Sequence, residues 1–271
     1  MVEKNTILVV GCGNMGAALA GGYARAYPEA EVVAIDRDPL RARALLPADS
    51  RVAVHADFTA LAGLRPAIII VALKPQVLGD VLGDFIALCA GALVVSIAAG
   101  VGCARLAELL GGHPRIVRAM PNLPVVVGEG MTTLFASGLS AADRARADGV
   151  FAAVGQTAWV ADEAAIDLAT AVAGSGPAYF FAFVEHLAAA GEAAGLPAEL
   201  AERLARQTCV GAAALLRDDP RAASALKAAV CSPGGTTQAG LAVMETPDGL
   251  AGLARQGVAA AYRRARELAG D

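Results

Sequence analysis

The hexapeptide GCGNMG (11–16) has the spacing of a turn that holds phosphate groups. It follows the apolar run TILVV (6–10) and opens a helix-compatible stretch, which is the context that gives G-x-G-x-x-G its meaning. Gly11 permits the tight turn, Gly13 lets the backbone approach a pyrophosphate, and Gly16 lets the helix pack closely on a sheet. A glycine-rich turn without a ligand is the alternative, and the strand–turn–helix context favours a bound dinucleotide.

An acidic residue and a basic residue, Asp36 and Arg37, directly follow EVVAI (31–35). Asp36 lies 20 residues after Gly16, where a carboxylate can accept hydrogen bonds from both ribose hydroxyls of NAD. The same carboxylate would repel the 2′-phosphate of NADP, whereas Arg37 could pair with that phosphate or lie on the adenine. The two residues argue in opposite directions. We expect use of NADH, or of both NADH and NADPH.

The segment SPGGTT (232–237) could hold an anion. Pro233 can begin a helical turn, Gly234 and Gly235 leave the backbone bare, and the two threonines add hydroxyl donors. Consecutive free N–H groups at a helix start bind anions through oriented dipoles, without a charged side chain. A plain interhelical turn is the alternative, but it would not need serine and two threonines as well.

Two further loops follow apolar runs. VALKPQ (71–76) places Lys74 at the carboxyl end of a predicted strand, where it points toward a ligand crevice or is a solvated lysine. SIAAGV (96–101) has only small side chains, which suits a loop beneath a flat cofactor ring.

The sequence has no Ser-His-Asp order and no Cys–His pairing, so the chemistry would come from the cofactor. Hydride transfer to an imine that carries a carboxylate fits this pattern.

Short apolar runs alternate with helix-compatible stretches throughout the first half. Runs rich in β-branched residues are typical of strands buried on both faces. Their alternation with helices predicts an α/β fold, with a parallel sheet covered by helices on both faces. The predicted strands are 6–10, 31–35, 52–54, 67–72, 92–97 and 115–119.

The second half is predicted to be helical, because strand signals stop after GQTAWVADE. We therefore expect an N-terminal Rossmann-type dinucleotide-binding domain (1–161) followed by an all-α substrate-binding and dimerisation domain (162–271). Helical stretches such as PAYFFAFVEHLAAAGEAAGL have too little polar surface for a monomer, which predicts helix exchange or packing across a dimer. GSGPAY (174–179) interrupts this helical region, and Pro177 suits the first turn of the helix that follows. A plain turn between helices is the alternative.

Composition argues against several classes of function. The chain has 271 residues, a net charge of −4 and no basic run, so we expect no binding to nucleic acid or a membrane surface. Its five cysteines lack any C-x-x-C and its histidines are scattered, which predicts reduced thiols and no metal site. The uncharged stretch 85–104 is as long as a membrane span, but its glycines favour a buried strand. No secretory signal is visible before Thr6, so a cytoplasmic location is expected.

Together these motifs resemble those of the pyrroline-5-carboxylate reductases, which make proline. The match runs nearly end to end, since GCGNMG, VALKP, SIAAGV, RAMPNLP, AVAGSGPAY and VCSPGGTT occur in the family's order. The resemblance implies hydride transfer from NADPH or NADH to the imine carbon of 1-pyrroline-5-carboxylate, giving L-proline. It also implies a homodimer interlocked through helical domains, with a site that can include both chains, and in some members a decamer.

The resemblance also implies roles for individual residues. Thr170, just before AVAGSGP, would be the catalytic residue, its hydroxyl orienting or hydrogen-bonding the imine. The substrate carboxylate would rest on Ser232, on Thr237 and on the backbone of Thr236. Expected to contact the cofactor are Gly11, Gly13, Asn14, Met15, Gly16, Asp36, Arg37, Ala72, Leu73, Lys74, Pro75, Ile97, Ala98 and Ala99. Expected near the nicotinamide and the substrate are Met120, Pro121, Asn122, Ser232, Gly235, Thr236 and Thr237.

The sequence departs from the family pattern at Asp36, where many members carry a neutral residue, and at Cys231, where threonine is frequent.

Two alternative functions remain. A β-hydroxyacid dehydrogenase shares the architecture but uses a lysine in the helix after its own glycine-rich turn, and GSGPAYFFAFVEH has none. A protein that binds dinucleotide without turnover would not need SPGGTT.

Overall fold

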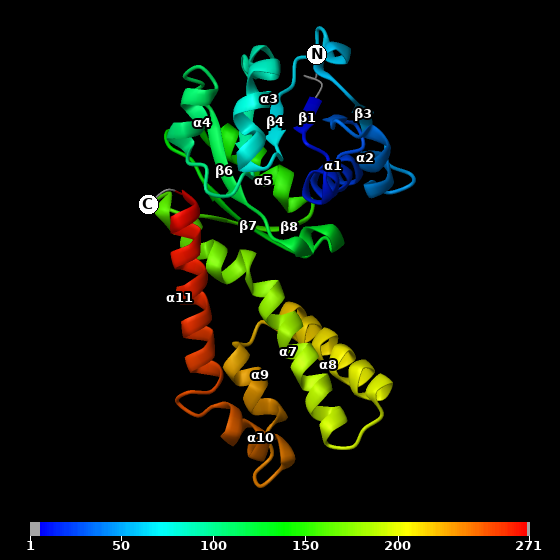
Figure 1. Ribbon diagram of the computed structural model, residues 1–271, viewed down its shortest axis with the longest axis vertical. Helices are drawn as coiled ribbons and strands as arrows, with labels where there is room; N and C mark the ends of the chain where they lie inside the picture. Colours follow the sequence, from blue (N-terminus) through cyan, green and yellow to red (C-terminus); the bar gives the residue numbers. More distant parts are fainter. Residues whose placement is uncertain (1–5, 270–271) are drawn as a thin grey trace. The chain divides into compact units, whose positions relative to one another are not determined.

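The computed structural model describes residues 6–269, which form two compact units (Figure 1). Within these residues, unit 1 runs to Ser175 and resumes at Ala261, and unit 2 is Gly176–Ala260. Residues 1–5, where the sequence predicts no secretory signal, lie outside the described part. None of the helices described combines the length and the apolar character that crossing a bilayer requires.

Unit 1 is built on one eight-stranded sheet with the order β3-β2-β1-β4-β5-β6-β7-β8. The first six strands are parallel, while β7 runs antiparallel to β6 and parallel to β8. The strands are β1 (Thr6–Val10), β2 (Glu31–Ile35), β3 (Ala53–His55), β4 (Ile68–Val71), β5 (Leu93–Ser96), β6 (Ile116–Met120), β7 (Gly130–Phe135) and β8 (Gly155–Trp159).

Helices cover both faces of this sheet, and each face has its own apolar cluster. Along β1, Ile7 and Val9 belong to one cluster, whereas Leu8 and Val10 belong to the other. A strand buried on both faces reads as a continuous apolar run, which is why the pattern was visible in the sequence. The helices of unit 1 are α1 (Asn14–Ala26), α2 (Pro39–Leu45), α3 (Leu78–Phe85), α4 (Cys103–Leu109), α5 (Ala141–Ala152) and α6 (Ala164–Ala169).

The predicted Rossmann-type α/β domain is confirmed, with its six predicted strands present at nearly the predicted bounds. The sequence did not predict β7 and β8. GMTTLF contains only short apolar runs, and GQTAW lies at the sheet edge with its residues partly exposed, so neither has the pattern of a fully buried strand. These two strands widen the sheet beyond β6.

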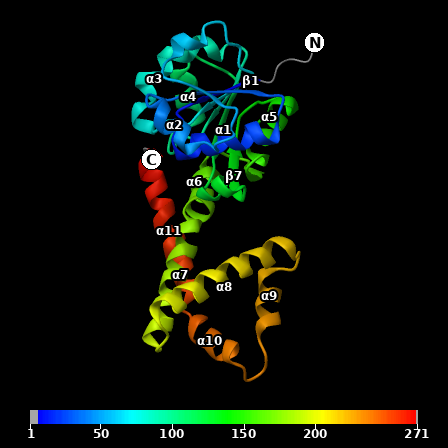
Figure 2. The same ribbon diagram turned by 90° about the vertical axis from the view of Figure 1, so that its right-hand side faces the viewer.

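Unit 2 is entirely helical, as predicted. It contains α7 (Gly176–Ala193), α8 (Ala198–Asp218), α9 (Ala223–Val230), α10 (Thr236–Met244) and the first part of α11 (Leu250–Ala269). Helices α7 and α8 pack against each other as a pair joined by a short turn (Figures 1 and 2). Large apolar side chains remain exposed on this unit, including Phe180 at 63%, Phe181 at 61% and Val243 at 73%. Exposed apolar surface of this kind marks an interface.

The segment GSGPAY is not a plain interhelical turn, and Pro177 lies in the first turn of a helix, as predicted. A π-helical turn (Thr170–Gly174) follows α6 directly, and α7 begins at Gly176. The compact unit extends past the predicted boundary at 161 to Ser175, because α6 buries Ile166 and Asp167.

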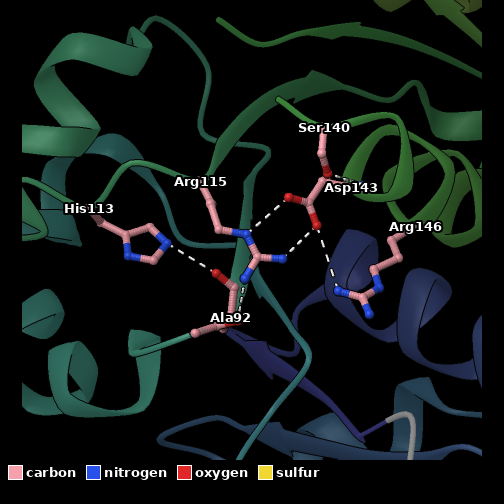
Figure 3. Close-up of polar contacts among 7 residues, drawn as sticks. Ala92, His113, Arg115, Ser140, Asp143 and Arg146 are labelled. Carbon is pink, nitrogen blue, oxygen red and sulfur yellow. Dashed lines mark hydrogen bonds and ion pairs between the residues drawn. The ribbon is translucent and has the colours of Figure 1, made fainter. Parts of the chain in front are cut away.

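An ion pair at the amino-terminal end of β6 ties this strand to α5 (Figure 3). Arg115 donates from Nε and Nη2 to the two carboxylate oxygens of Asp143 at 3.0 and 2.5 Å, and also to the carbonyl of Gly91. Ser140 and Arg146 contact Asp143 as well. Hydrogen bonding to Arg115 holds the pKa of the Asp143 carboxyl below its ordinary value of 3.8.

We predict that Asp143→Asn lowers the free energy of unfolding near neutral pH by about 1.5–3 kcal/mol, since a charge-assisted bidentate contact is lost. Because the pKa of Asp143 is lower in the folded than in the unfolded state, this contribution is complete above 3.8 and is lost as the pH falls below that value. The deficit of the variant should therefore shrink in acid. Urea unfolding at several pH values measures it. The control is Glu108→Gln in the exposed Arg105–Glu108 pair, which should change little; equal losses in both variants would contradict the prediction.

Candidate active site

The carboxyl ends of β1, β4, β5 and β6 lie in register at one edge of the sheet. Val10 pairs with Val71, Val71 with Ser96, and Ser96 with Arg118. The segments after β1, β4 and β5 start directly beyond this row, and β6 ends two residues further on, at Met120. All four leave the sheet at its carboxyl edge, which is where ligands bind in open α/β sheets. Three of them are predicted cofactor loops and the fourth is the predicted nicotinamide segment: 11–16, 72–75, 97–99 and 120–122.

The glycine turn after β1 has the geometry that its spacing predicts. Gly11 has φ +91°, and a Cβ there would lie 2.6 Å from the carbonyl oxygen of Ala72. A Cβ on Gly16 would lie 2.0 Å from the carbonyl oxygen of Gly11, so helix and turn are in direct backbone contact. At Gly13, by contrast, an added Cβ meets nothing within 4 Å. The first and third glycines serve packing, and the second leaves open space above the backbone.

Asp36 is held beside this turn at the end of β2. Its carboxylate accepts hydrogen bonds from the backbone N–H of Cys12 at 2.8 Å and of Asp38 at 3.0 Å. The side chain is partly exposed, and the neighbouring Arg37 is exposed. The Asp36 carboxylate is therefore held beside the position predicted for the ribose of a dinucleotide. Each carboxylate oxygen retains a lone pair for a further hydrogen bond.

Burial disfavours the thiolate form of the two cysteines near this edge, Cys12 and Cys103. Burial, with a smaller contribution from the charge of Asp36, raises the pKa of Cys12 to about 11. Burial and the charge of Glu163 raise the pKa of Cys103 to about 12. Both remain protonated at neutral pH, which argues against a thiolate nucleophile. In the described part of the chain, no group of His, Cys, Asp and Glu side chains could hold a metal ion.

A small pocket of about 50 Å³ lies beyond the ends of β5 and β6 in unit 1. It brings together three predicted groups that are distant in sequence: Ala98 and Ala99 after β5, Met120 at the end of β6, and Thr170. The remaining lining residues are Gly100, Arg118, Ala119, Asp167, Ala265 and Leu268.

Thr170 is the first residue of the π-helical turn. Its hydroxyl donates to the carbonyl of Ile166 at 2.7 Å, and its own carbonyl accepts from Ser175 N–H at 2.9 Å, the i to i+5 bond of a π-turn. Gly174 packs on it, since a Cβ there would lie 3.2 Å from Thr170 Cγ2 and 3.5 Å from Met120 Cε. Single π-turns within helices are frequent at functional sites.

Asn122 uses its side chain inside unit 1. Its Nδ2 donates to the carbonyl of Ala173 at 3.0 Å, and its Oδ1 accepts from Met131 N–H at 2.8 Å. The buried amide thus links the end of β6 to β7 and to the π-turn. Its contacts are those of a residue that shapes the pocket, and a role toward the substrate stays a prediction.

The other predicted residues differ in accessibility. Gly11, Gly16, Ala98 and Pro121 are buried; Gly13, Met15, Ala72, Leu73, Ile97 and Met120 are half-buried; Asn14, Lys74, Pro75 and Ala99 are exposed.

Sequence reasoning missed a buried charge cluster beside the pocket. Arg118 on β6 is 5% exposed and pairs with Asp167, which is 7% exposed, and with Glu163. The signal was available in RAMPNLP, because an arginine within an apolar strand must find a partner when it is buried. Its partner could not be inferred, since Asp167 lies 49 residues further along the chain.

The segment SPGGTT lies in unit 2. The helix begins at Thr236 with Gly235 as its N-cap, so Pro233 belongs to the preceding turn and does not start the helix. Gly235 N–H donates to the carbonyl of Ser232 at 3.0 Å. The N–H groups of Thr236 and Thr237 occupy the first helical turn, where no intrahelical acceptor exists.

Unit 1 has the features of a dinucleotide-binding α/β domain: the glycine turn after β1, and parallel strands whose carboxyl ends meet at one edge of the sheet. Two family models match: one described as NADP oxidoreductase coenzyme F420-dependent over residues 6–100, and one described as pyrroline-5-carboxylate reductase dimerisation over residues 163–268. The chain is 38% identical over 266 residues to a pyrroline-5-carboxylate reductase of Pseudomonas aeruginosa, covering 97% of this chain and 96% of that one.

Solved structures agree. The Coxiella burnetii pyrroline-5-carboxylate reductase superposes with a TM-score of 0.88 at 33% identity, covering 98% of this chain and 99% of that chain. A Plasmodium falciparum pyrroline carboxylate reductase, solved with NADP bound, gives 0.80 at 28% identity, covering 99% and 100%. The chain belongs to the pyrroline-5-carboxylate reductase family, which confirms the resemblance inferred from its motifs.

The glycine turn yields a prediction that separates folding from binding. Gly16→Ala should destabilise the fold by about 1–3 kcal/mol or more, because its Cβ meets backbone. Gly13 has φ −73° and open space, so Gly13→Ala should fold with a small loss of stability and bind dinucleotide about tenfold more weakly. Thermal unfolding and fluorescence titration with NADPH and NADH measure the two effects. Unchanged affinity in Gly13→Ala would remove this turn from the cofactor site.

Proposed function

We propose that this chain reduces 1-pyrroline-5-carboxylate to L-proline with NADPH or NADH. Its family membership supports this function. The structural observation that carries it is the pocket at the carboxyl edge, where Ala98 and Ala99, Met120 and Thr170 meet. A cofactor that extends from the glycine turn along the in-register strand ends would reach this pocket.

The residues of this edge fit a dinucleotide. Gly13 leaves its backbone open, the N-terminus of α1 would offer free N–H groups to a pyrophosphate, and the Asp36 carboxylate beside the turn would accept hydrogen bonds from a ribose. The segments 11–16, 72–75 and 97–99, with Asp36 and Arg37, would hold it. When bound, the reduced nicotinamide supplies a hydride for the imine carbon. The protonated imine nitrogen then becomes the secondary amine of proline, so no further proton donor is needed.

Thr170 is suited to hold that nitrogen. Its hydroxyl hydrogen is engaged by the carbonyl of Ile166, which leaves the oxygen lone pairs to accept a hydrogen bond from the N–H of a protonated imine. We assign Thr170 this orienting role and not that of an acid.

The carboxylate of the substrate would be bound at SPGGTT. The free N–H groups of Thr236 and Thr237, their hydroxyls and Ser232 form an uncharged donor set at the start of α10. The N–H of Gly235 is already used within the turn, and a Cβ at Gly235 would lie 2.3 Å from the Ser232 hydroxyl oxygen, so this glycine makes room for Ser232.

Self-association is supported by the match to a dimerisation domain and by the exposed apolar side chains of unit 2. We propose a homodimer. Assembly into a decamer and location in the cytoplasm stay predictions from the sequence.

The alternatives are less well supported. The described part of α7 contains no lysine where a β-hydroxyacid dehydrogenase would need one. A binding protein without turnover does not account for a second, anion-binding turn.

Asp36 leads to a prediction about cofactor choice. We expect kcat/KM for NADH to equal or exceed that for NADPH, and Asp36→Asn to shift the ratio toward NADPH by about tenfold, since like-charge repulsion is removed. Steady-state reduction of 1-pyrroline-5-carboxylate, followed by absorbance of the reduced cofactor, measures both. The control Asp38→Asn removes a neighbouring charge that caps α2 and should shift the ratio less. Strong NADPH preference in the wild type would refute the role given to Asp36.

The two threonine sites can be separated by their kinetics. Thr170→Val should lower kcat about tenfold or more with KM nearly unchanged, because the imine loses its orienting partner, and Thr170→Ser should retain activity. Thr237→Val should raise KM for the substrate, at a cost of about 1.5–3 kcal/mol. Full activity of Thr170→Val would end its assigned role. If Thr237→Val lowers kcat and Thr170→Val does not, the contact to the imine would have to be assigned to α10.

A further inference from the structure

The charge cluster at the pocket consists of one guanidinium and two carboxylates. Arg118 Nη2 donates to Asp167 Oδ1 at 2.5 Å, and Arg118 Nη1 lies 3.5 Å from Glu163 Oε1. The side chains of Arg118 and Asp167 are only 6% and 11% exposed. Well-packed apolar residues often stabilise a protein as much as a buried ion pair does, so the cluster calls for an explanation other than stability.

The cluster joins three elements around the pocket. Arg118 comes from β6, and Asp167 and Glu163 come from α6 and the residue before it. Glu163 Oε1 also accepts the N–H of Cys103, the first residue of α4, at 2.7 Å. The position of α6 relative to β6 and to the segment after β5 is thereby fixed by directional hydrogen bonds.

Asp167 lies one helical turn before Thr170, at the spacing that places two side chains on the same face. Both line the pocket, together with Arg118. The acceptor for the Thr170 hydroxyl is the carbonyl of Ile166, the residue next to Asp167. Where Asp167 is held therefore determines where the hydroxyl of Thr170 lies.

We propose that Arg118 and Asp167 are positioning residues for the reduction, which act by fixing α6 and hence the hydroxyl of Thr170. This inference rests on the proposed function of Thr170. Asp167 does not need to touch the substrate, because its effect passes through the helix that carries Thr170.

The test is a double-mutant cycle of Asp167→Asn with Thr170→Val in the full-length enzyme. Asn keeps the size of the side chain and one acceptor oxygen but loses the charge. We expect Asp167→Asn alone to lower kcat by about 10- to 100-fold, since small misplacements near the reacting atoms have effects of this size. The KM for the substrate and the Kd for the cofactor should change less than about twofold. In the Thr170→Val background, Asp167→Asn should lower kcat further by less than about twofold.

A merely structural role would give another pattern. Asp143→Asn, which removes a charge from the Arg115 ion pair at the opposite edge, serves as the control and should lose stability with kcat unchanged. Equal effects of Asp167→Asn in both backgrounds, or an unchanged kcat in a folded variant, would overturn the positioning role. Full kcat in Thr170→Val would instead overturn the proposed function of Thr170 and this inference with it. If Asp167→Asn does not fold, Glu163→Gln takes its place in the same cycle and is judged by the same outcomes.

Discussion

The parallel register of four strands is the constraint on which the rest of the structure depends. Val10, Val71, Ser96 and Arg118 form one row across the sheet. The segments after β1, β4 and β5 leave the sheet directly beyond this row, and β6 ends two residues beyond it, at Met120. Segments more than a hundred positions apart in sequence therefore reach the same edge. Antiparallel strands would alternate their ends between two edges and could not gather the segments in this way. The meeting of these segments at one edge therefore follows from the backbone pairing of the sheet.

The last member of this row differs from the others in chemistry. Arg118 is a charged residue inside an apolar sheet. Its carboxylate partners, Glu163 and Asp167, belong to the segment that leads into the π-turn. Asn122, two residues beyond the end of β6, makes a second link from this strand to the π-turn. Both contacts are directional, whereas the two apolar clusters that cover the faces of the sheet have no directional preference. The side chains of Arg118 and Asn122 thus join β6 and the residues after it to the segment that carries Thr170.

Much of the fold could be predicted because its signals are local. Buried parallel strands read as continuous apolar runs, and the turn after β1 has a spacing with a physical meaning. The strands β7 and β8 were not predicted, because β7 contains only short apolar runs and β8 is a partly exposed edge strand. The π-turn was not predicted, because no local pattern in the sequence marks it; its contacts are tertiary, with Gly174 close to Met120 and the Ala173 carbonyl bonded by Asn122. Arg118 was visible as an odd residue, but the identity of its partner depends on tertiary structure. Roles of Thr170 and SPGGTT came from resemblance and chemistry, and they stay proposals.

The most direct measurement is a crystal structure of the protein with the oxidised cofactor and L-proline. The account predicts a dinucleotide along the carboxyl edge, with its pyrophosphate on the amides of 13–16 and its nicotinamide beside Met120 and the pocket that contains Thr170. Electron density for the cofactor at any other place, such as the amino-terminal edge around Arg115, would contradict it.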